Sequence, residues 1–136
     1  MNPETSIPKI LGVPIEVRFR DMDSMGHVNN AVYFTYLEMA RVAFYRHFMG
    51  ATQIQDLEMI AAKATCEFRS PATWNDRLLA RIWVSRVGTS SFDFDYEITD
   101  ENSGRLIATA QTIQVAWDYR TDSKKLVPQR LRELLL

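Results

Sequence analysis

The feature that most constrains this chain is the uninterrupted run at residues 29–49, which reads NNAVYFTYLEMARVAFYRHFM. It contains no Gly or Pro and no strict alternation of apolar and polar residues, which predicts one long helix. Asn29 or Asn30 is expected at its N-cap, and Gly50 lies where a helix-terminating glycine is common. Because few positions of this run are polar, the helix needs other elements wrapped around it.

The segments outside this helix have the pattern of strands. Alternation of apolar and polar residues is clearest in residues 92–99, where four aromatic or aliphatic side chains are interleaved with acidic and hydroxyl ones. The polar turn at residues 100–104 joins this segment to the next, so the two are expected to be antiparallel neighbours. The predicted strands are residues 15–20, 60–69, 77–87, 92–99 and 106–117.

This order of elements predicts an α+β domain in which an antiparallel sheet of about five strands is wrapped around one long central helix. We expect residues 1–136 to form this single domain, with residues 1–12 as a loose lead-in and a short helix or extended arm after Pro128. Such a sheet has open edges, and a small domain often hides an edge against a second copy. A homodimer, or a dimer of dimers, is therefore expected.

Composition excludes some classes of function. The net charge of −1 offers no basic excess for a nucleic-acid backbone. Cys66 is the only cysteine, so an internal disulfide is impossible, and we expect a small buried thiol on a strand. No Cys/His cluster has the spacing of a zinc site. The first residues lack a signal-peptide pattern and no stretch has the length of a membrane span, so a cytoplasmic protein is expected.

The residues that could carry chemistry lie between the first strand and the helix, in the segment DMDSMGHVNN at residues 21–30. The first N–H groups of a helix lack intrahelical partners and carry partial positive charge. A carboxylate beside them could act as base or nucleophile while they bind an oxyanion. Ordinary capping and turn chemistry, worth about 1 kcal/mol, explains the same composition. From composition alone, capping is the favoured interpretation.

The longer string VRFRDMDSMGHVNNAVYFTYLEMAR resembles the signature of the 4-hydroxybenzoyl-CoA thioesterase-like family of the hotdog superfamily. It is also similar to bacterial long-chain acyl-CoA thioesterases and to the corresponding region of plant acyl-ACP thioesterases. The similarity is dense here: a D-x-D pair, then His, VNN, an aromatic residue and L-E-x-A-R. The resemblance implies a hotdog fold and an acyl-CoA thioesterase that needs no metal or other cofactor.

Within this resemblance, Asp23 matches the catalytic carboxylate, which serves either as nucleophile or as a base that activates water. The backbone N–H groups of Asn30 and Ala31 match the donors that polarise the thioester carbonyl. His27 and Asn29 match positions that orient the carboxylate or the water. Plant acyl-ACP enzymes have Asn two residues after the catalytic Asp, where this chain has Met25. This difference favours the acyl-CoA branch.

Two further assignments concern charged residues outside this loop. Glu38 is expected to form an ion pair with Arg41, three residues later on a mostly buried helix. Its alternative is a catalytic role, since another hotdog branch uses a helix glutamate. In the family that the chain resembles, the turn between the third and fourth predicted strands lies near the nucleotide part of coenzyme A. Arg69 and Lys63 are alternative cations for binding the phosphates of CoA. The predicted CoA contacts in that turn are Arg86, Thr89, Ser90 and Ser91.

Three functions are therefore open from the sequence. The first is hydrolysis of an acyl-CoA thioester to a free acid and CoA. The second is action on acyl-carrier-protein thioesters or as a hydratase, although the His/Asp motif of the hydratases is absent from this chain. The third is a non-catalytic hotdog module that binds acyl groups, which gives no reason for a carboxylate at this helix end. The identity of the acyl group is not determined.

Overall fold

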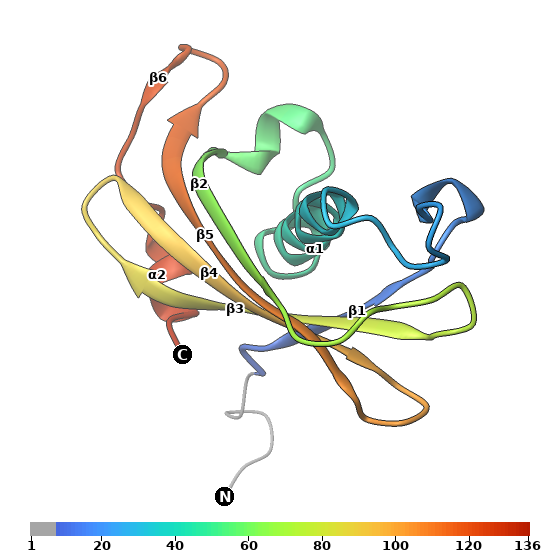
Figure 1. Cartoon of the computed structure of the whole chain (residues 1–136). Coiled ribbons are helices and arrows are strands. Elements are labelled where there is room, and N and C mark those ends of the chain that lie inside the picture. Colours follow the sequence, from blue (N-terminus) through green and yellow to red (C-terminus); the bar gives the residue numbers. More distant parts are fainter. Residues whose placement is uncertain (1–7) are drawn as a thin grey trace, which may run out of the picture.

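A computed structural model of the chain describes residues 8–136 and contains one long helix and one main sheet (Figure 1). The predicted α+β layout is confirmed, with five main strands and an added two-residue strand. The elements are β1 (Leu11–Ile15), η2 (Phe19–Asp21), α1 (Val32–Met49), η3 (Ile54–Leu57), β2 (Met59–Phe68), β3 (Leu78–Val87), β4 (Ser91–Asp100), β5 (Leu106–Asp118), β6 (Ser123–Lys124) and α2 (Gln129–Glu133).

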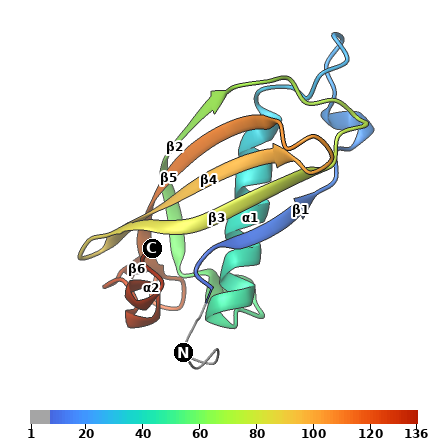
Figure 2. The ribbon, with the colours of Figure 1, turned by 90° about the horizontal axis from the view of Figure 1, so that it is seen from below.

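The sheet is antiparallel and curls around α1, which lies in its concave side (Figures 1 and 2). Its strand order is β1-β3-β4-β5-β2, and β6 pairs with β5 outside this path. The strands β4 and β5 are neighbours, as their short connecting turn predicts. The connection from β1 through α1 to β2 joins the two edges of the sheet, so the residues before α1 lie beside both edge strands.

The core lies between α1 and the concave face of the sheet. Burial alternates along β3 and β4, so every second side chain points toward the helix. Phe44 of α1 packs edge-on against Phe94 of β4, with ring centroids 4.8 Å apart. The short helix α2, in the position expected after Pro128, contributes Leu131 to the same core, and Leu134 directly after the helix is buried there too.

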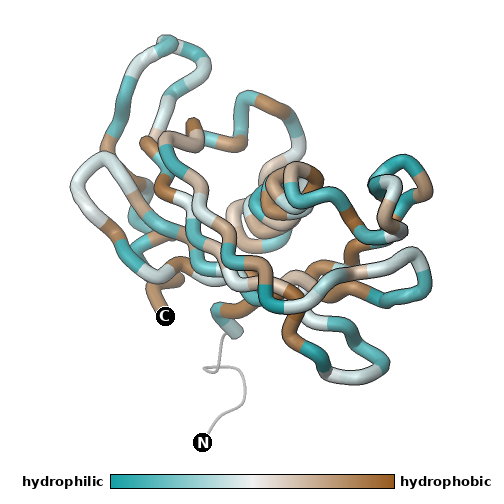
Figure 3. Tube along the Cα trace, viewed as in Figure 1, coloured by the Kyte–Doolittle hydropathy of each residue, from teal (hydrophilic) through white to brown (hydrophobic). Residues whose placement is uncertain are grey.

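The helix has two faces rather than an apolar surface enclosed on all sides. Tyr36, Leu37, Ala40 and Phe44 are fully buried, whereas Phe34, Glu38 and Met39 are exposed. A single curved sheet contacts a helix along one side, so the opposite face of α1 stays open. Hydrophobic and hydrophilic positions accordingly alternate around α1 (Figure 3). The predicted central helix is confirmed, and one chain leaves its outer face exposed.

Two predicted boundaries need correction. The first strand ends at Ile15 instead of starting there, although burial continues to alternate through Val17. The alternation shows which side chains face the core, but it does not show which residues form hydrogen bonds with a neighbouring strand. The helix starts at Val32 with Ala31 as N-cap, later than expected from Asn29 or Asn30. At the other end, the prediction is confirmed: Gly50 takes the left-handed conformation that favours glycine (φ 67°).

The strand β2 lies at an edge of the sheet and pairs only with β5 among the described residues. Most of its side chains are exposed, although its sequence is as apolar as that of a buried strand. Within residues 8–136, no helix combines the length and hydropathy needed to cross a membrane. Most of the lead-in predicted at residues 1–12 lies outside the described residues, and Leu11 and Gly12 belong to β1.

Candidate active site

The loop between η2 and α1 is a small closed hairpin. Met22 and Val28 form an antiparallel bridge, and Asp23 N–H donates to the His27 carbonyl at 2.8 Å. Gly26 closes the turn with a φ of 79°, a conformation that side chains with a Cβ rarely adopt. Val28 N–H also donates to the carbonyl of Ala72, which fixes the loop to the chain that follows β2. The loop is therefore held by backbone hydrogen bonds along its whole length.

Asp23 has one carboxylate oxygen that accepts hydrogen bonds from the loop backbone and one that accepts none from the described residues. Its Oδ1 accepts hydrogen bonds from the Met25 N–H at 2.8 Å and the His27 N–H at 3.3 Å. Its Oδ2 has no hydrogen-bond donor within the described part of the chain. This arrangement fixes the side chain while leaving one oxygen to attack a carbonyl carbon or to accept a proton from water.

The start of α1 presents one unused backbone donor. Asn29 Oδ1 accepts a hydrogen bond from the Ala31 N–H at 2.9 Å, and Val32 N–H donates to the Asn29 carbonyl at 2.9 Å. The Asn30 N–H has no acceptor among residues 8–136. Of the two donors predicted to polarise a carbonyl, the N–H of Asn30 is thus available and that of Ala31 is engaged by the Asn29 side chain.

A shallow pocket of about 240 Å³ joins these groups. It brings together three predicted site residues, Asp23, His27 and Asn30, but neither Asn29 nor Ala31 lines it. No hydrogen bond of the described residues joins the His27 ring to the Asp23 carboxylate. The pocket is lined by Asp23, His27, Val28, Asn30, Tyr33, Phe68, Arg69, Ser70 and Pro71. It therefore lies between the loop, the first turn of α1 and the end of β2.

Tyr33 and Phe68 form the apolar wall of this pocket. Their ring centroids lie 5.2 Å apart in an edge-on contact, which joins the first turn of α1 to the end of β2. Burial raises the pKa of the Tyr33 hydroxyl to about 12, so it is neutral at physiological pH. In the sequence, only the position of Tyr33 after the VNN segment marks it, and nothing marks Phe68.

Asp21, which stands in the predicted loop segment 21–30, is 1% exposed and is the most buried carboxylate among residues 8–136. It accepts hydrogen bonds from the backbone and guanidinium of Arg18 and from the Tyr36 hydroxyl at 2.7 Å. Burial alone would raise the pKa of Asp21, but the bonds from Arg18 and Tyr36 outweigh it, so the pKa lies below its usual value. The signal that sequence reasoning missed is the spacing R-x-x-D.

The predicted CoA-binding turn lies far from this pocket in the same chain. Figure 2 shows the β3–β4 turn and the loop before α1 at opposite ends of the sheet. Arg86 Nη2 donates to Asp93 Oδ1 at 2.8 Å and to Ser91 Oγ at 2.9 Å, so its charge is already paired. The backbone carbonyls of Thr89 and Ser90 accept hydrogen bonds from Val127 and Ala116. The structure does not bring this turn and Asp23 together.

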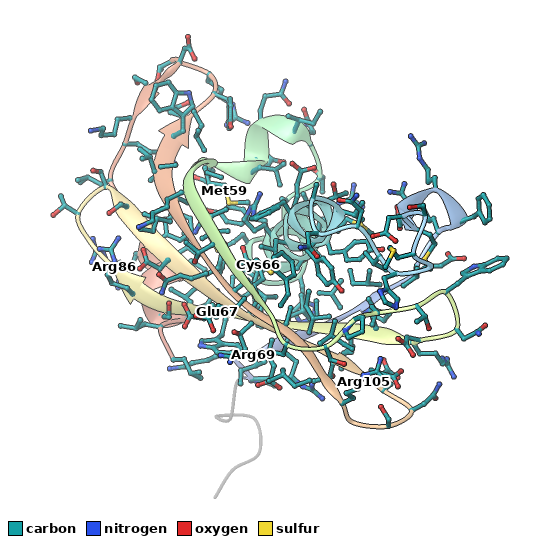
Figure 4. All side chains as sticks on the ribbon, viewed as in Figure 1. Met59, Cys66, Glu67, Arg69, Arg86 and Arg105 are labelled. Atoms are coloured by element: carbon teal, nitrogen blue, oxygen red, sulfur yellow. The ribbon has the colours of Figure 1, made fainter. Side chains whose placement is uncertain are left out.

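Of the two alternative cations, Arg69 is the one at the pocket. It lies at the end of β2, well separated from Arg86 in Figure 4, and forms an exposed ion pair with Glu67. Lys63 is exposed further along β2 and does not line the pocket. An exposed ion pair is weak, so Arg69 can exchange its partner for a ligand anion at little cost.

The predicted Glu38–Arg41 ion pair is absent from the described residues. Glu38 is exposed on the open face of α1, where water solvates its charge. Arg41 turns toward the sheet instead, and its Nη1 donates to the Tyr96 hydroxyl at 3.3 Å, which is hydrogen-bonded to Thr112 Oγ1 at 2.6 Å. The prediction failed because Glu38 lies on the face of α1 that the sheet leaves uncovered.

Cys66 is poorly suited to act as a nucleophile. Cys66 is half-buried on β2, and burial raises the pKa of its thiol to about 11, which disfavours the nucleophilic thiolate. Among residues 8–136, no group of three or more His, Cys, Asp or Glu side chains is arranged to hold a metal ion. The loop pocket is thus the site that the chemistry of the described residues favours.

The chain is similar in sequence and in fold to proteins named as thioesterases or acyl-CoA hydrolases. The 1,4-dihydroxy-2-naphthoyl-CoA hydrolase of Synechocystis is 28% identical over 122 residues, which cover 84% of this chain and 86% of that protein. The long-chain acyl-CoA thioesterase FadM of Escherichia coli is 28% identical over 124 residues, covering 89% and 93%. A thioesterase from Thermus thermophilus, solved with coenzyme A and zinc, has a TM-score of 0.78 at 25% identity, covering 90% of this chain and 94% of that one.

The region of similarity extends well beyond the loop and the helix on which the resemblance was first based. A family model described as the thioesterase-like superfamily matches residues 17–135, which include every strand after β1 and both α-helices. The hotdog fold that the sequence resemblance implied is confirmed. This chain belongs to the thioesterase-like superfamily.

Proposed function

We propose that this protein hydrolyses an acyl-CoA thioester to a free acid and coenzyme A. The observation that carries the proposal is that one pocket contains both a carboxylate with one free oxygen and a helix N–H group without an acceptor. Asp23 Oδ2 and the Asn30 N–H both lack partners among the described residues, and both residues line one pocket. A named acyl-CoA hydrolase and an acyl-CoA thioesterase among the relatives support the substrate class.

In the proposed reaction, the thioester carbonyl oxygen accepts a hydrogen bond from Asn30 N–H, where the helix dipole favours growing negative charge. Two routes then fit Asp23. In one, Oδ2 attacks the carbonyl carbon, the C–S bond breaks to release CoA thiolate, and water hydrolyses the resulting mixed anhydride. In the other, Oδ2 takes a proton from water as the water attacks the carbonyl, and the thiolate leaves with a proton. Both routes consume one water and yield the acid and CoA.

His27 and Asn29 have different places in this proposal. His27 lines the pocket beside Asp23, and its ring can orient the attacking water. Asn29 acts through the backbone, because its side-chain oxygen accepts the Ala31 N–H and so shapes the first turn of α1. If the Ala31 N–H also binds the oxyanion, as the family resemblance predicts, the Asn29 side chain must first turn away.

The test compares two carboxylates of similar local geometry. Asp118 also accepts hydrogen bonds from loop N–H groups, those of Arg120 at 2.8 Å and Thr121 at 3.3 Å, but it lies at the end of β5, outside the pocket. Asp23→Asn should abolish turnover of short, long and aromatic acyl-CoA substrates, measured by release of free thiol, whereas Asp118→Asn should retain it. Full activity in the Asp23 variant refutes this assignment. After a single turnover in ¹⁸O-water, label in Asp23 would establish the anhydride route, because the general-base route places the water oxygen only in the released acid.

Acyl-carrier-protein thioesters are the second candidate substrate, since their acyl half is the same. Met25 stands where the plant acyl-ACP enzymes have Asn, which favours the CoA thioester. Comparing kcat/KM for acyl-CoA and acyl-ACP of matched chain length decides between them. If neither is hydrolysed above background while acyl-CoA still binds, the protein is a non-catalytic acyl-binding module.

The CoA contacts predicted at Arg86, Thr89, Ser90 and Ser91 need a second copy of the chain if they are to reach the pocket. β3 and β4 are each ten residues long, so about 30 Å of strand separates the turn from the opposite end of the sheet. Arg69 is the better-placed cation within one chain. We expect Arg69→Ala to raise KM for acyl-CoA more than Arg86→Ala does, with kcat little changed.

We also propose that the protein is a homodimer in which β2 pairs with β2 of a second copy. The free edge of β2 and its exposed apolar residues, Ile60 and Phe68, support this pairing. The pocket would then lie at the junction of the two subunits, because Phe68 and Arg69 line it. Light scattering after size exclusion tests the stoichiometry, and a mass of four chains indicates a dimer of dimers.

A single domain over residues 1–136 and a cytoplasmic location remain predictions from the sequence.

A further inference from the structure

The carboxylate of Asp21 links the loop that carries Asp23 to the second turn of α1. Its Oδ2 accepts a hydrogen bond from the Tyr36 hydroxyl at 2.7 Å, and both side chains are buried. Tyr36 is on the second turn of α1, beyond the residues that start the helix. This contact therefore joins the loop to a rigid part of the helix, whereas the contacts of the helix start involve only the first turn.

The backbone of Asp21 forms the other half of this link. Its carbonyl accepts the Asn29 N–H at 2.9 Å, and the Met22–Val28 bridge follows immediately. Asp21 and Asn29 thus form the base of the loop, with Asp23 two residues from the anchored carboxylate. Because the loop is closed by backbone hydrogen bonds, a shift at its base moves Asp23 relative to the Asn30 N–H.

Arg18 keeps the anchor charged. Its backbone N–H donates to Asp21 Oδ2 at 3.0 Å, and its guanidinium donates to Oδ1 at 2.8 Å. Both oxygens of Asp21 are therefore engaged, in contrast to Asp23, whose Oδ2 is free within the described residues. In the D-x-D pair, both carboxylate oxygens of Asp21 accept hydrogen bonds, whereas only one oxygen of Asp23 does. This difference suits Asp21 to a structural role and Asp23 to a chemical one.

We propose that Asp21 and Tyr36 are positioning residues, which hold the Asp23 carboxylate at the reactive distance from a carbonyl bound at the start of α1. The proposal rests on the function proposed above. Catalysis depends steeply on such geometry, since a misplacement of about 1 Å can cost about 100-fold in rate. Binding of the CoA part, proposed above at Arg69 near the end of β2, should depend little on this anchor.

The test removes one hydroxyl and uses a matched control on the same helix. Tyr36→Phe deletes the donor to Asp21 and leaves the ring in place. Tyr45→Phe deletes a hydroxyl that is equally buried on α1 but has no hydrogen-bond partner among the described residues. We expect Tyr36→Phe to lower kcat by about 10-fold or more with KM within about twofold, and Tyr45→Phe to match the wild type.

A second measurement reports on the loop without using turnover. Hydrogen–deuterium exchange of a peptide covering residues 22–29 should be faster in Tyr36→Phe than in the wild type and unchanged in Tyr45→Phe. If Tyr36→Phe folds poorly, Arg18→Gln provides the same test from the exposed side of the anchor, with slower turnover and faster exchange in this peptide. A wild type without thioesterase activity refutes the proposed function, but the exchange experiment still decides whether Tyr36 anchors the loop.

Two kinetic results, and one result from hydrogen exchange, overturn the positioning role. One is a Tyr36→Phe variant with kcat within twofold of the wild type. The other is an effect confined to KM, which would place Tyr36 and Asp21 in substrate binding instead. Unchanged exchange in residues 22–29 in both the Tyr36 and Arg18 variants also overturns it, because the loop would then be held without the anchor.

Discussion

The side-chain oxygen of Asn29 lies 2.9 Å from the backbone nitrogen of Ala31 and accepts its hydrogen bond. Asn29 precedes the helix by the spacing of an Asx turn, so its side chain stabilises the start of α1 instead of pointing into the pocket. The same residue therefore controls two properties: the stability of the helix start, and the electrostatic field at the neighbouring Asn30 N–H.

Replacing Asn29 by aspartate separates these two properties. Aspartate keeps the acceptor and adds negative charge at a helix N-terminus, so the free energy of unfolding should be unchanged or higher by about 0.5 kcal/mol. The same charge opposes an oxyanion at the Asn30 N–H, so kcat should fall by about 10-fold. Urea unfolding and thiol-release kinetics measure the two effects.

Asn29→Ala is the matched control. It should lower the free energy of unfolding by about 1 kcal/mol through loss of the capping oxygen. Its kcat should fall less than that of the aspartate variant, because no charge is added and the Ala31 N–H becomes available. Equal activity in the aspartate variant and the wild type would show that no negative charge develops at this helix end.

Arg86 is predicted to be important for stability through Asp93. The Asp93 side chain is 9% exposed and the Arg86 side chain 46%, and their contact is 2.8 Å. Arg86→Ala leaves a buried carboxylate without its cation, which should lower the free energy of unfolding by about 1–3 kcal/mol, toward the lower end because Arg86 is half exposed. Urea unfolding at neutral pH measures it.

The double variant Arg86→Ala/Asp93→Ala provides the control for this pair. Removing both charges should recover much of the lost stability, since no buried charge is then left unpaired. If the double variant is less stable than Arg86→Ala by the full cost of Asp93→Ala alone, the two residues are energetically independent and this explanation is wrong.

The fold was predictable from the sequence because its signals are local and repeated. The alternation in residues 92–99 and the polar turn after them predicted β4, β5 and their pairing. The lack of Gly and Pro before Gly50 predicted α1. These patterns determine which side chains face a core, and they do not determine how much of each surface one chain covers. The open face of α1 around Glu38 could therefore not be predicted.

The candidate site was predictable only in part for the same reason. Asp23 and Asn30 stand in a motif whose spacing places them at a helix start, and the structure brings them to one pocket. Asp21 is hydrogen-bonded to Tyr36, fifteen residues away, and Phe68 reaches the pocket from the distant edge strand. Contacts that depend on tertiary packing have no local pattern, so R-x-x-D at Arg18 was the only available hint.

The loss of folding stability at acid pH should depend on Asp21. The folded-state pKa of this carboxyl is lowered, because hydrogen bonds from Arg18 and Tyr36 outweigh the effect of burial. A depressed carboxyl pKa contributes stability above the unfolded-state pKa of about 3.9, and that contribution is lost as the pH falls through the folded-state pKa. We expect Asp21→Asn to be less stable than the wild type at pH 7.

The difference between the two proteins should shrink as the pH falls below about 4, since wild-type Asp21 then becomes protonated and neutral too. Urea unfolding from pH 2 to pH 7 measures both curves. Parallel curves over this range would contradict the assignment, because the stabilisation by Asp21 would not then depend on its charge.

Cys66 should react slowly in the folded protein. Burial on β2 raises the pKa of its thiol to about 11. Only the thiolate attacks a disulfide reagent, and an ordinary cysteine has a pKa of about 8.5, so labelling at pH 8 should be on the order of 100-fold slower in the folded chain than in urea. An aromatic disulfide reagent followed by absorbance measures both rates.

Cys66→Ala should keep thioesterase activity, because no step proposed for Asp23 needs a thiol. Folded-state labelling as fast as in urea would show that Cys66 is exposed, and loss of activity in Cys66→Ala with intact folding would place the thiol in the reaction.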